Sequence, residues 1–186
     1  IITKDMMMGW AKQVEEATQG RVKFNLLPKA VASPPGTFDA VRDGLADVSL
    51  TVHGYTPGRF PMTKMAEFPF LGDSAEAISV AYWRTYMKHM AKLDEHKGLV
   101  LLGLMTHGPG QIYMTKQKVT SLSDLANQKI RVGGGVVVDV TKAIGAVPLL
   151  KPASETYEVL KSGIADGIFF PKDSVPAFKL VPLINH

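Results

Sequence analysis

The sequence contains no cysteine. The chain can therefore form no disulfide bond and offers no thiolate ligand to a metal ion, but this absence is compatible with any compartment. Long hydrophobic runs are also missing. The longest, residues 98–105, is far shorter than the roughly 20 residues that a membrane-spanning helix needs, and we interpret it as a buried strand.

Dense runs of one charge are absent as well. The formal net charge is +4, and the 21 lysines and arginines are spread along the chain. A nucleic-acid surface needs clustered basic side chains, so we expect ordinary solubility and no nucleic-acid partner. A content of 46% hydrophobic and 20% charged residues excludes general disorder and predicts a globular chain of one large or two small domains.

An initiator methionine is missing too. The chain begins at Ile1, already entering an expected helix, and stops at His186 within an unfinished element. We therefore expect a chain that is incomplete at both ends. A missing signal peptide then carries no information.

Helices and strands are expected to alternate along the chain. The apolar spacing predicts helices over residues 3–18, 34–46, 75–97, 136–144 and 155–162. Runs of β-prone residues predict strands over residues 21–27, 47–52, 99–105, 111–116, 129–132, 147–150 and 166–170. Strands that alternate with helices of this size favour an α/β fold with mainly parallel pairing.

An internal repeat indicates the domain organisation. Residues 37–47 align without gaps on residues 156–166, and in both copies a helix ends at a glycine before a β-prone run. A generic α/β unit can produce such a repeat by chance. Taken at face value, the repeat predicts two α/β lobes with a sheet each, residues 1–113 and an incomplete 114–186. A ligand cleft between the lobes is then expected, because open α/β sheets bind ligands at the carboxyl ends of their strands.

Arg131 is the first candidate for a ligand contact. It belongs to the expected strand 129–132, which runs through Gly133–Gly135 into the helix that starts at Val136. The free backbone N–H groups of such a loop and the positive end of the helix dipole favour an anion. A guanidinium held on a strand can bind a carboxylate with two parallel hydrogen bonds. The alternative is a solvated or structurally paired arginine, which is the commoner arrangement.

Eight residues in and near the loops at the ends of the expected strands are candidates for ligand binding. They are Arg131, Tyr55, Glu67, Phe68, His107, Gly133, Phe169 and Phe170. One fixed cation among several aromatic rings suits an apolar or aromatic carboxylate better than it suits hydrolysis. The rings are expected to form an apolar wall that favours aromatic or branched monocarboxylates over sugar acids, because a hydroxyl group would lose its hydrogen bonds there.

Several segments, taken in their order and spacing, resemble one known family. They are TQGRVKF (residues 18–24), FP followed by EFPFL (60–61 and 67–71), VTSLSDL leading to KIRV (119–125 and 129–132), and GIADG (163–167). Together they look like the successive signatures of the solute-binding subunits of TRAP (tripartite ATP-independent periplasmic) transporters, in the dicarboxylate-receptor-like family. The similarity runs through nearly the whole chain.

This resemblance implies a two-lobed, periplasmic-binding-protein-like receptor that closes on a small organic acid in the periplasm and delivers it to the membrane permease subunits. It also implies that Arg131 pairs with the ligand carboxylate. Members of the family are longer at both ends, so the 1–113 lobe would lack its first strand and the 114–186 lobe would be incomplete. Residues 168–170 replace a polar acid–amide pair that many relatives carry, which argues against a polar sugar acid.

Two other functions remain open from the sequence. An α/β enzyme acting on a carboxylate would use His107 or His53 as a general base near Arg131, but no orienting partner, nucleophile or metal-binding spacing accompanies them. A ligand-sensing domain would carry the same cation and would differ in what is attached to it. We expect a monomer without catalysis, cofactor or metal. The identity of the acid is not encoded in any of these patterns.

Overall fold

The structure, a computed structural model, describes residues 6–186. The chain divides into two compact units, Ile1–Val31 and Ala32–His186. In the part of the chain that is described, no helix is both long enough and apolar enough to cross a membrane.

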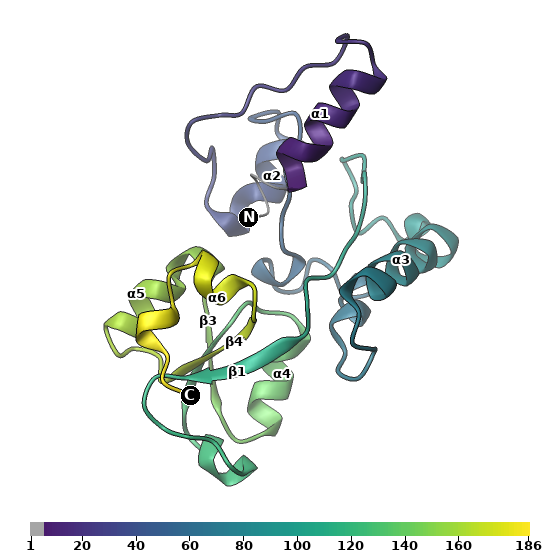
Figure 1. Ribbon diagram of the computed structural model, residues 1–186. Helices are drawn as coiled ribbons and strands as arrows, with labels where there is room; N and C mark the ends of the chain where they lie inside the picture. The colour runs from purple at the N-terminus through teal and green to yellow at the C-terminus, as the bar shows by residue number, and fades with distance from the viewer. Residues whose placement is uncertain (1–5) are drawn as a thin grey trace. The chain divides into compact units, whose positions relative to one another are not determined.

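The first unit contains helix α1 (Met8–Ala17; Figure 1). The start expected for this helix, at Thr3, lies outside the described residues. Trp10 on α1 packs edge-on against Phe24, with ring centroids 5.0 Å apart. The helix ends at Thr18, which begins the turn that leads into the following loop.

Short helices form the N-terminal part of the second unit. They are η2 (Pro34–Gly36), α2 (Thr37–Arg42), η3 (His53–Tyr55), η4 (Thr63–Glu67), α3 (Ala75–Thr85), η5 (Tyr86–Met90) and η6 (Ala91–Leu93), where η marks a 3₁₀ or π turn. The α3 helix begins after Ser74, whose hydroxyl accepts a hydrogen bond from the Ala77 N–H at 3.2 Å. The helix expected over residues 75–97 therefore forms only as far as Leu93, as α3 followed by π and 3₁₀ turns, and the chain leaves it at Asp94, which has a φ of 56°.

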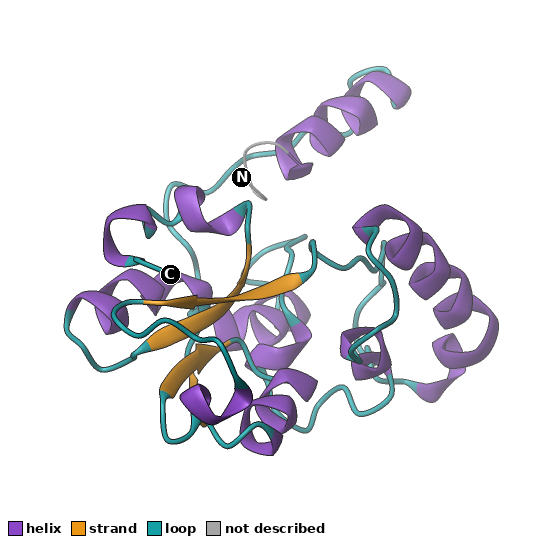
Figure 2. Cartoon of the chain, turned by 60° about the horizontal axis from the view of Figure 1, so that its bottom comes forward, coloured by secondary structure: helices purple, strands orange, loops and turns teal. Residues whose placement is uncertain are grey.

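The described strands form one four-stranded sheet (Figure 2). They are β1 (Gly110–Met114), β2 (Lys129–Val132), β3 (Val147–Leu150) and β4 (Gly167–Pro171), arranged in the order β1-β4-β2-β3. β2 pairs in parallel with β3 and β4, whereas β1 pairs antiparallel with β4. The remaining helices are η7 (Leu122–Leu125), α4 (Val136–Ala143), η8 (Ala153–Glu155), α5 (Thr156–Lys161), α6 (Ser174–Ala177) and η9 (Val181–Leu183). The expected α/β class and the mainly parallel pairing are confirmed.

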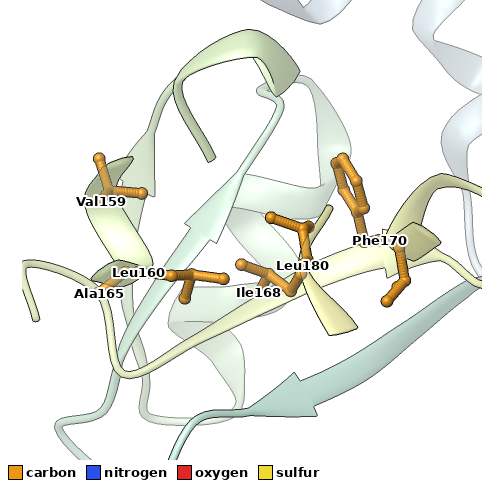
Figure 3. Close-up of a cluster of buried hydrophobic side chains, with 7 residues drawn as sticks. Val159, Leu160, Ala165, Ile168, Phe170 and Leu180 are labelled. Atoms are coloured by element: carbon orange, nitrogen blue, oxygen red, sulfur yellow. The ribbon is translucent and has the colours of Figure 1, made fainter. Parts of the chain in front are cut away.

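A hydrophobic cluster covers each face of this sheet. On one face, α5 and α6 pack on β4 around Leu160 and Ile168 (Figures 1 and 3). On the other face, α4 and η7 pack on β2 around Ile130 and Val132. Successive side chains of a strand point to opposite faces, so Arg131 points to the face covered by α5 and α6.

The prediction of three further strands is wrong. Residues 21–27, 47–52 and 99–105 run as loops, and none of them pairs with a described segment. A strand is stable only when a neighbouring strand satisfies its backbone N–H and C=O groups, so β-prone residues alone are not sufficient. Val100 is 85% exposed and Leu102 is 61% exposed, so this apolar run is not the buried strand that its composition predicts.

The internal repeat is confirmed for its helices. Both α2 and α5 follow a 3₁₀ turn and begin at a threonine, and after each helix a glycine has a positive φ, 77° at Gly44 and 73° at Gly163. Only the second copy is followed by a strand, β4. A separate sheet for each copy is therefore not found within residues 6–186. The division into lobes 1–113 and 114–186 stays a prediction.

Candidate functional site

Arg131 is buried near the carboxyl end of β2, with only 2% of its surface exposed. Its Nε and Nη2 atoms both donate to the backbone carbonyl of Lys151, Nε at 2.9 Å. Arg131 is paired with Leu149 in the parallel register of β2 and β3, so its side chain reaches the loop in which β3 ends. The guanidinium thus lies at the edge where open α/β sheets bind ligands.

Among residues 6–186, no acidic side chain forms an ion pair with Arg131. Among the described residues, every ion pair joins side chains that are at least partly exposed, as between Arg59 and Asp39, and none includes Arg131. Burial lowers the pKa of Arg131, while the nearby Tyr55 hydroxyl and the charge of Glu155 oppose that effect. Leaving a buried charge unpaired costs roughly 3 to 5 kcal/mol, so a bound anion would be strongly stabilised here.

Tyr55 and Gly133 lie directly beside the guanidinium. The Tyr55 hydroxyl accepts a hydrogen bond from the Ala153 N–H at 3.0 Å. A Cβ atom on Gly133 would lie 3.6 Å from Tyr55 Cε1 and 3.8 Å from Arg131 Nη2. The structure therefore brings three of the candidate residues together in one group. Their role as ligand contacts stays a prediction.

The two phenylalanines of β4 lie on opposite faces of the sheet. The ring centroid of Phe170 is 5.1 Å from Arg131 Cζ, in the range of a cation–π contact. Phe170 belongs to the same cluster as Ile168 (Figure 3), whereas Phe169 packs against the cluster on the other face. The structure thus brings Phe170 to Arg131 but not Phe169, because side chains alternate along a strand. Phe68 is 52% exposed, and its ring has no described contact with this group.

Glu67 places its carboxylate on the N-terminus of α4. Its Oε2 atom accepts a hydrogen bond from the Val136 N–H at 2.8 Å. The carboxylate occupies the space that a Cβ atom on Gly135 would need. Burial raises the pKa of Glu67, while the Val136 hydrogen bond, His107 and Lys64 lower it. The loop end that favours an anion is therefore occupied by a carboxylate of the chain itself.

Close backbone contact joins η3 to the glycine loop after β2. A Cβ atom on Gly54 would lie 2.9 Å from the carbonyl carbon of Gly134, which is closer than two such atoms can approach. Gly134 also has a φ of 100°, a conformation that side chains disfavour. Both positions need glycine, and their contact places Tyr55 beside Arg131.

His53, which is half-buried, and His96, which is buried, belong to a separate chain of hydrogen-bonding groups. Their Nε2 atoms are 3.1 Å apart. The Nδ1 atom of His53 is 3.3 Å from the Thr63 hydroxyl, and Nδ1 of His96 is 3.2 Å from the Tyr86 hydroxyl. Burial lowers the pKa of His53 to about 4, so its ring is neutral at pH 7. Both nitrogens of His53 face this chain, which does not favour a general base directed at Arg131.

His107, the other candidate base, is exposed, and its Nδ1 atom lies 2.7 Å from the Gly108 carbonyl. Within residues 6–186, no group of three or more histidine, cysteine, aspartate or glutamate side chains is arranged to hold a metal ion. A cavity of about 310 Å³ is lined by Asp73, Ala75, Gly108, Pro109, Gln111, Lys172 and Asp173. None of the eight candidate residues lines it, so it is distinct from the group around Arg131.

Sequence reasoning missed the backbone groups that hold Arg131 and Tyr55. The Lys151 carbonyl and the Ala153 N–H both belong to the loop that follows strand 147–150. The loops that the sequence predicts as ligand-binding follow other strands. Ligands of open α/β sheets bind at the carboxyl ends of the strands, and this loop follows such an end. The position of the loop after strand 147–150 could therefore have identified it from the sequence.

Comparison with known proteins identifies the family. Residues 2–184 match the model of the bacterial extracellular solute-binding proteins, family 7. A TRAP periplasmic solute-binding protein of Bordetella bronchiseptica, crystallised with bound (R)- and (S)-mandelate, is 52% identical; the match covers 100% of this chain and 59% of that chain, with a TM-score of 0.97. A TRAP solute-binding protein of Rhodoferax ferrireducens T118, in complex with copurified benzoate, is 33% identical over 98% of this chain and 57% of that chain, with a TM-score of 0.91.

A curated relative supports the same assignment. The outer membrane transporter protein TsaT of Comamonas testosteroni is 28% identical over 179 residues, which are 96% of this chain and 53% of that protein. The chain thus spans about half the length of this relative. The family expected from the sequence motifs is confirmed, and so is the fold. This chain belongs to the bacterial extracellular solute-binding proteins of family 7, the receptors of TRAP transporters.

Proposed function

We propose that this chain is the ligand-binding part of an extracytoplasmic receptor, which captures a small organic acid and delivers it to a TRAP-type membrane permease. The observation that carries the proposal is the buried charge of Arg131, which forms no ion pair with any residue that the structure describes. Its Nε and Nη2 atoms donate to the Lys151 carbonyl, and Nη1 makes no hydrogen bond to a described residue, so we assign the carboxylate to the Nη1 side of the guanidinium. A fixed cation of this kind recognises an anion without further ordering.

The proposed ligand is an aromatic monocarboxylate. The Phe170 ring lies beside the Arg131 cation and offers an apolar surface next to the place of the carboxylate. Tyr55 adds a second ring on the side of Gly133. Relatives that are 52% and 33% identical to this chain over the matched residues were crystallised with mandelate and benzoate, which supports this class.

Binding is proposed to occur without catalysis, in a monomeric receptor of the periplasm. A general base would have to face the ligand carboxylate, but His53 is engaged with His96 and Thr63. The ligand contacts proposed here are Arg131, Tyr55, Gly133 and Phe170. The proposed lobe 1–113 would then supply Tyr55, and the proposed lobe 114–186 would supply Arg131, Gly133 and Phe170.

A pair of isosteric compounds tests this function. Benzoate and mandelate should raise the melting temperature and bind in calorimetry, whereas benzamide, which has the same shape but no charge, should not. A ligand at 100 times its Kd stabilises the folded state by about 2.7 kcal/mol, which thermal unfolding detects easily. The ligand recovered after prolonged incubation should be unchanged in mass spectrometry. Equal binding of benzamide, or a chemically altered ligand, would contradict the proposal.

A further inference from the structure

The turn η3 is held by the side chain of its first residue, His53. The His53 ring stacks on the buried Phe60 ring, with centroids 3.9 Å apart and planes inclined by 17°. Both ring nitrogens have partners as well, because Nδ1 is 3.3 Å from the Thr63 hydroxyl and Nε2 is 3.1 Å from Nε2 of His96. A ring that is stacked on one face and bonded at both nitrogens has a fixed position.

His96 is fixed by a second hydroxyl group. Its Nδ1 atom is 3.2 Å from the Tyr86 hydroxyl, and the two rings pack edge-on with centroids 5.4 Å apart. Burial lowers the pKa of both histidines, although the charge of Glu95 opposes this effect, and both rings are therefore mainly neutral at pH 7. A neutral imidazole has one N–H donor and one acceptor nitrogen, so the Nε2 atoms of two such rings can share one hydrogen bond.

The other two residues of η3 lie against the Arg131 group. A Cβ atom on Gly54 would be 2.9 Å from the carbonyl carbon of Gly134, and the Tyr55 hydroxyl accepts the Ala153 N–H at 3.0 Å. Burial lowers the pKa of Arg131, and the Tyr55 hydroxyl opposes this effect, as expected of a neighbouring polar group. One side of η3 is thus bound to the histidine pair and the other to the proposed ligand site.

The backbone of η3 links these two sides. The Tyr55 N–H donates to the Val52 carbonyl and the Thr56 N–H donates to the His53 carbonyl, both at 3.1 Å. Consecutive Cα atoms are about 3.8 Å apart, so a hydrogen-bonded turn of three residues is too short for its ends to move independently. A displacement of His53 therefore also displaces Tyr55.

We propose that the histidine pair, His53 and His96, positions the ligand site by fixing η3 so that Tyr55 stays beside the bound carboxylate. The pair acts through Tyr55 and is not itself a ligand contact. A side chain that is ordered before binding adds affinity, because ordering it during binding would reduce the binding free energy. This inference rests on the proposed function, and it extends that function by naming residues that hold the site in place.

Two substitutions of His53 test the role by calorimetry with benzoate at pH 7 on folded protein. His53→Leu removes both hydrogen bonds and should weaken binding by about three- to tenfold, the cost of ordering one side chain on binding. His53→Gln keeps an amide group that can bond to His96 and should bind within about twofold of wild type. His89 is an exposed histidine in η5, so His89→Leu is the matched control and should bind like wild type.

A double-mutant cycle tests whether the effect passes through Tyr55. In a Tyr55→Ala background, His53→Leu should weaken binding by less than about twofold, because the residue that it positions is already absent. The same loss of effect is expected for His96→Leu. Additive losses would overturn the inference. So would wild-type affinity in His53→Leu, and if Arg131→Ala still abolished binding, the proposed function would remain intact.

Amide hydrogen exchange measures the positioning role without a ligand. The Ala153 N–H is bonded to the Tyr55 hydroxyl, so its exchange should be at least about fivefold faster in folded His53→Leu than in wild type. The Lys151 N–H, which donates to the Val132 carbonyl, should keep its rate and controls for general destabilisation. If wild-type protein failed to bind benzoate, the proposed function would fail and Ala153 exchange alone would decide the inference. An unchanged rate at Ala153 would overturn it.

Discussion

Arg131 differs from the other arginines of the chain in the surroundings of its charge. Arg42 and Arg59 are partly exposed and share the Asp39 carboxylate, an arrangement that contributes little to stability. Arg131 is 2% exposed, and a backbone carbonyl is its hydrogen-bond acceptor. A carbonyl orients the guanidinium but does not neutralise it. The folded protein therefore carries a buried cation, and the free energy lost by burying this charge can be offset by an acidic ligand.

Gly135 offers a test of the Glu67 contact through the backbone. Gly135 and Gly163 have nearly the same φ, 70° and 73°, but only Gly135 has a close neighbour, the Glu67 carboxylate. A left-handed φ costs an alanine about 1 to 2 kcal/mol, so Gly163→Ala should lose about that much stability. Gly135→Ala should lose clearly more, because Glu67 must also be displaced and because the ψ of Gly135, −150°, puts its backbone in a region that is essentially restricted to glycine. Urea unfolding of the two variants measures the difference, and equal losses would show that the contact is dispensable.

At the scale of elements, the sequence predicts the second half of the chain better than the first. Strands 129–132 and 147–150 are each followed closely by a helix, and their partners lie within a short stretch of sequence. Local periodicity and the positions of glycines are then sufficient to predict these strands and helices. Residues 47–52 and 99–105 have equally β-prone sequences but no described partner, and sequence patterns of a single segment do not report on its partner.

The candidate site shows the same limit. Arg131 and Gly133 are adjacent to a strand end and could be placed from local pattern alone. The alternation rule separates Phe170 from Phe169 once the strand is known, whereas the sequence alone predicts that both contact the ligand. The contact of Glu67 with Val136 joins distant segments, and no spacing rule predicts it.

The pair formed by His53 in η3 and His96 in the turn that follows η6 should make stability depend on pH. The pKa of His53 is about 4 in the folded protein and near 6.5 when unfolded, with burial as the main cause and His96 as the second. Glu95, nearby, partly opposes the effect. Between these values the unfolded state binds a proton that the folded state does not, so stability is full above pH 6.5 and falls as the pH is lowered towards 4.

The His53→Gln variant measures this dependence. Its free energy of unfolding should fall less steeply with acid, by up to about 1.4 kcal/mol per pH unit, the value for one proton. His89 is exposed and lies outside the pair, so His89→Gln serves as the control and should keep the wild-type slope. A wild-type slope in His53→Gln would show that the pair does not control acid stability.

At the scale of the whole molecule, the site is built by segments from both predicted lobes. Tyr55, Gly54 and Glu67 precede residue 113, and they contact the loops that follow β2 and β3. Contacts of this kind are expected of a receptor in which a ligand holds two lobes together. The match covers 59% of the mandelate-bound relative. Transport of an acid, as proposed above, is therefore a function proposed for a full-length receptor and not for residues 1–186 alone.

The proposed carboxylate binding depends most on Arg131, and calorimetry with benzoate on folded wild-type and variant proteins tests it directly. Arg131→Ala should weaken binding by about 2 to 5 kcal/mol, or roughly 30-fold to several-thousand-fold, because the ligand carboxylate loses its partner. Arg131→Lys keeps the charge but loses the planar fork, so its affinity should lie between those of alanine and wild type. Arg59→Ala removes a partly exposed arginine and should bind like wild type. Wild-type affinity in Arg131→Ala, with the fold verified by circular dichroism, would contradict the account.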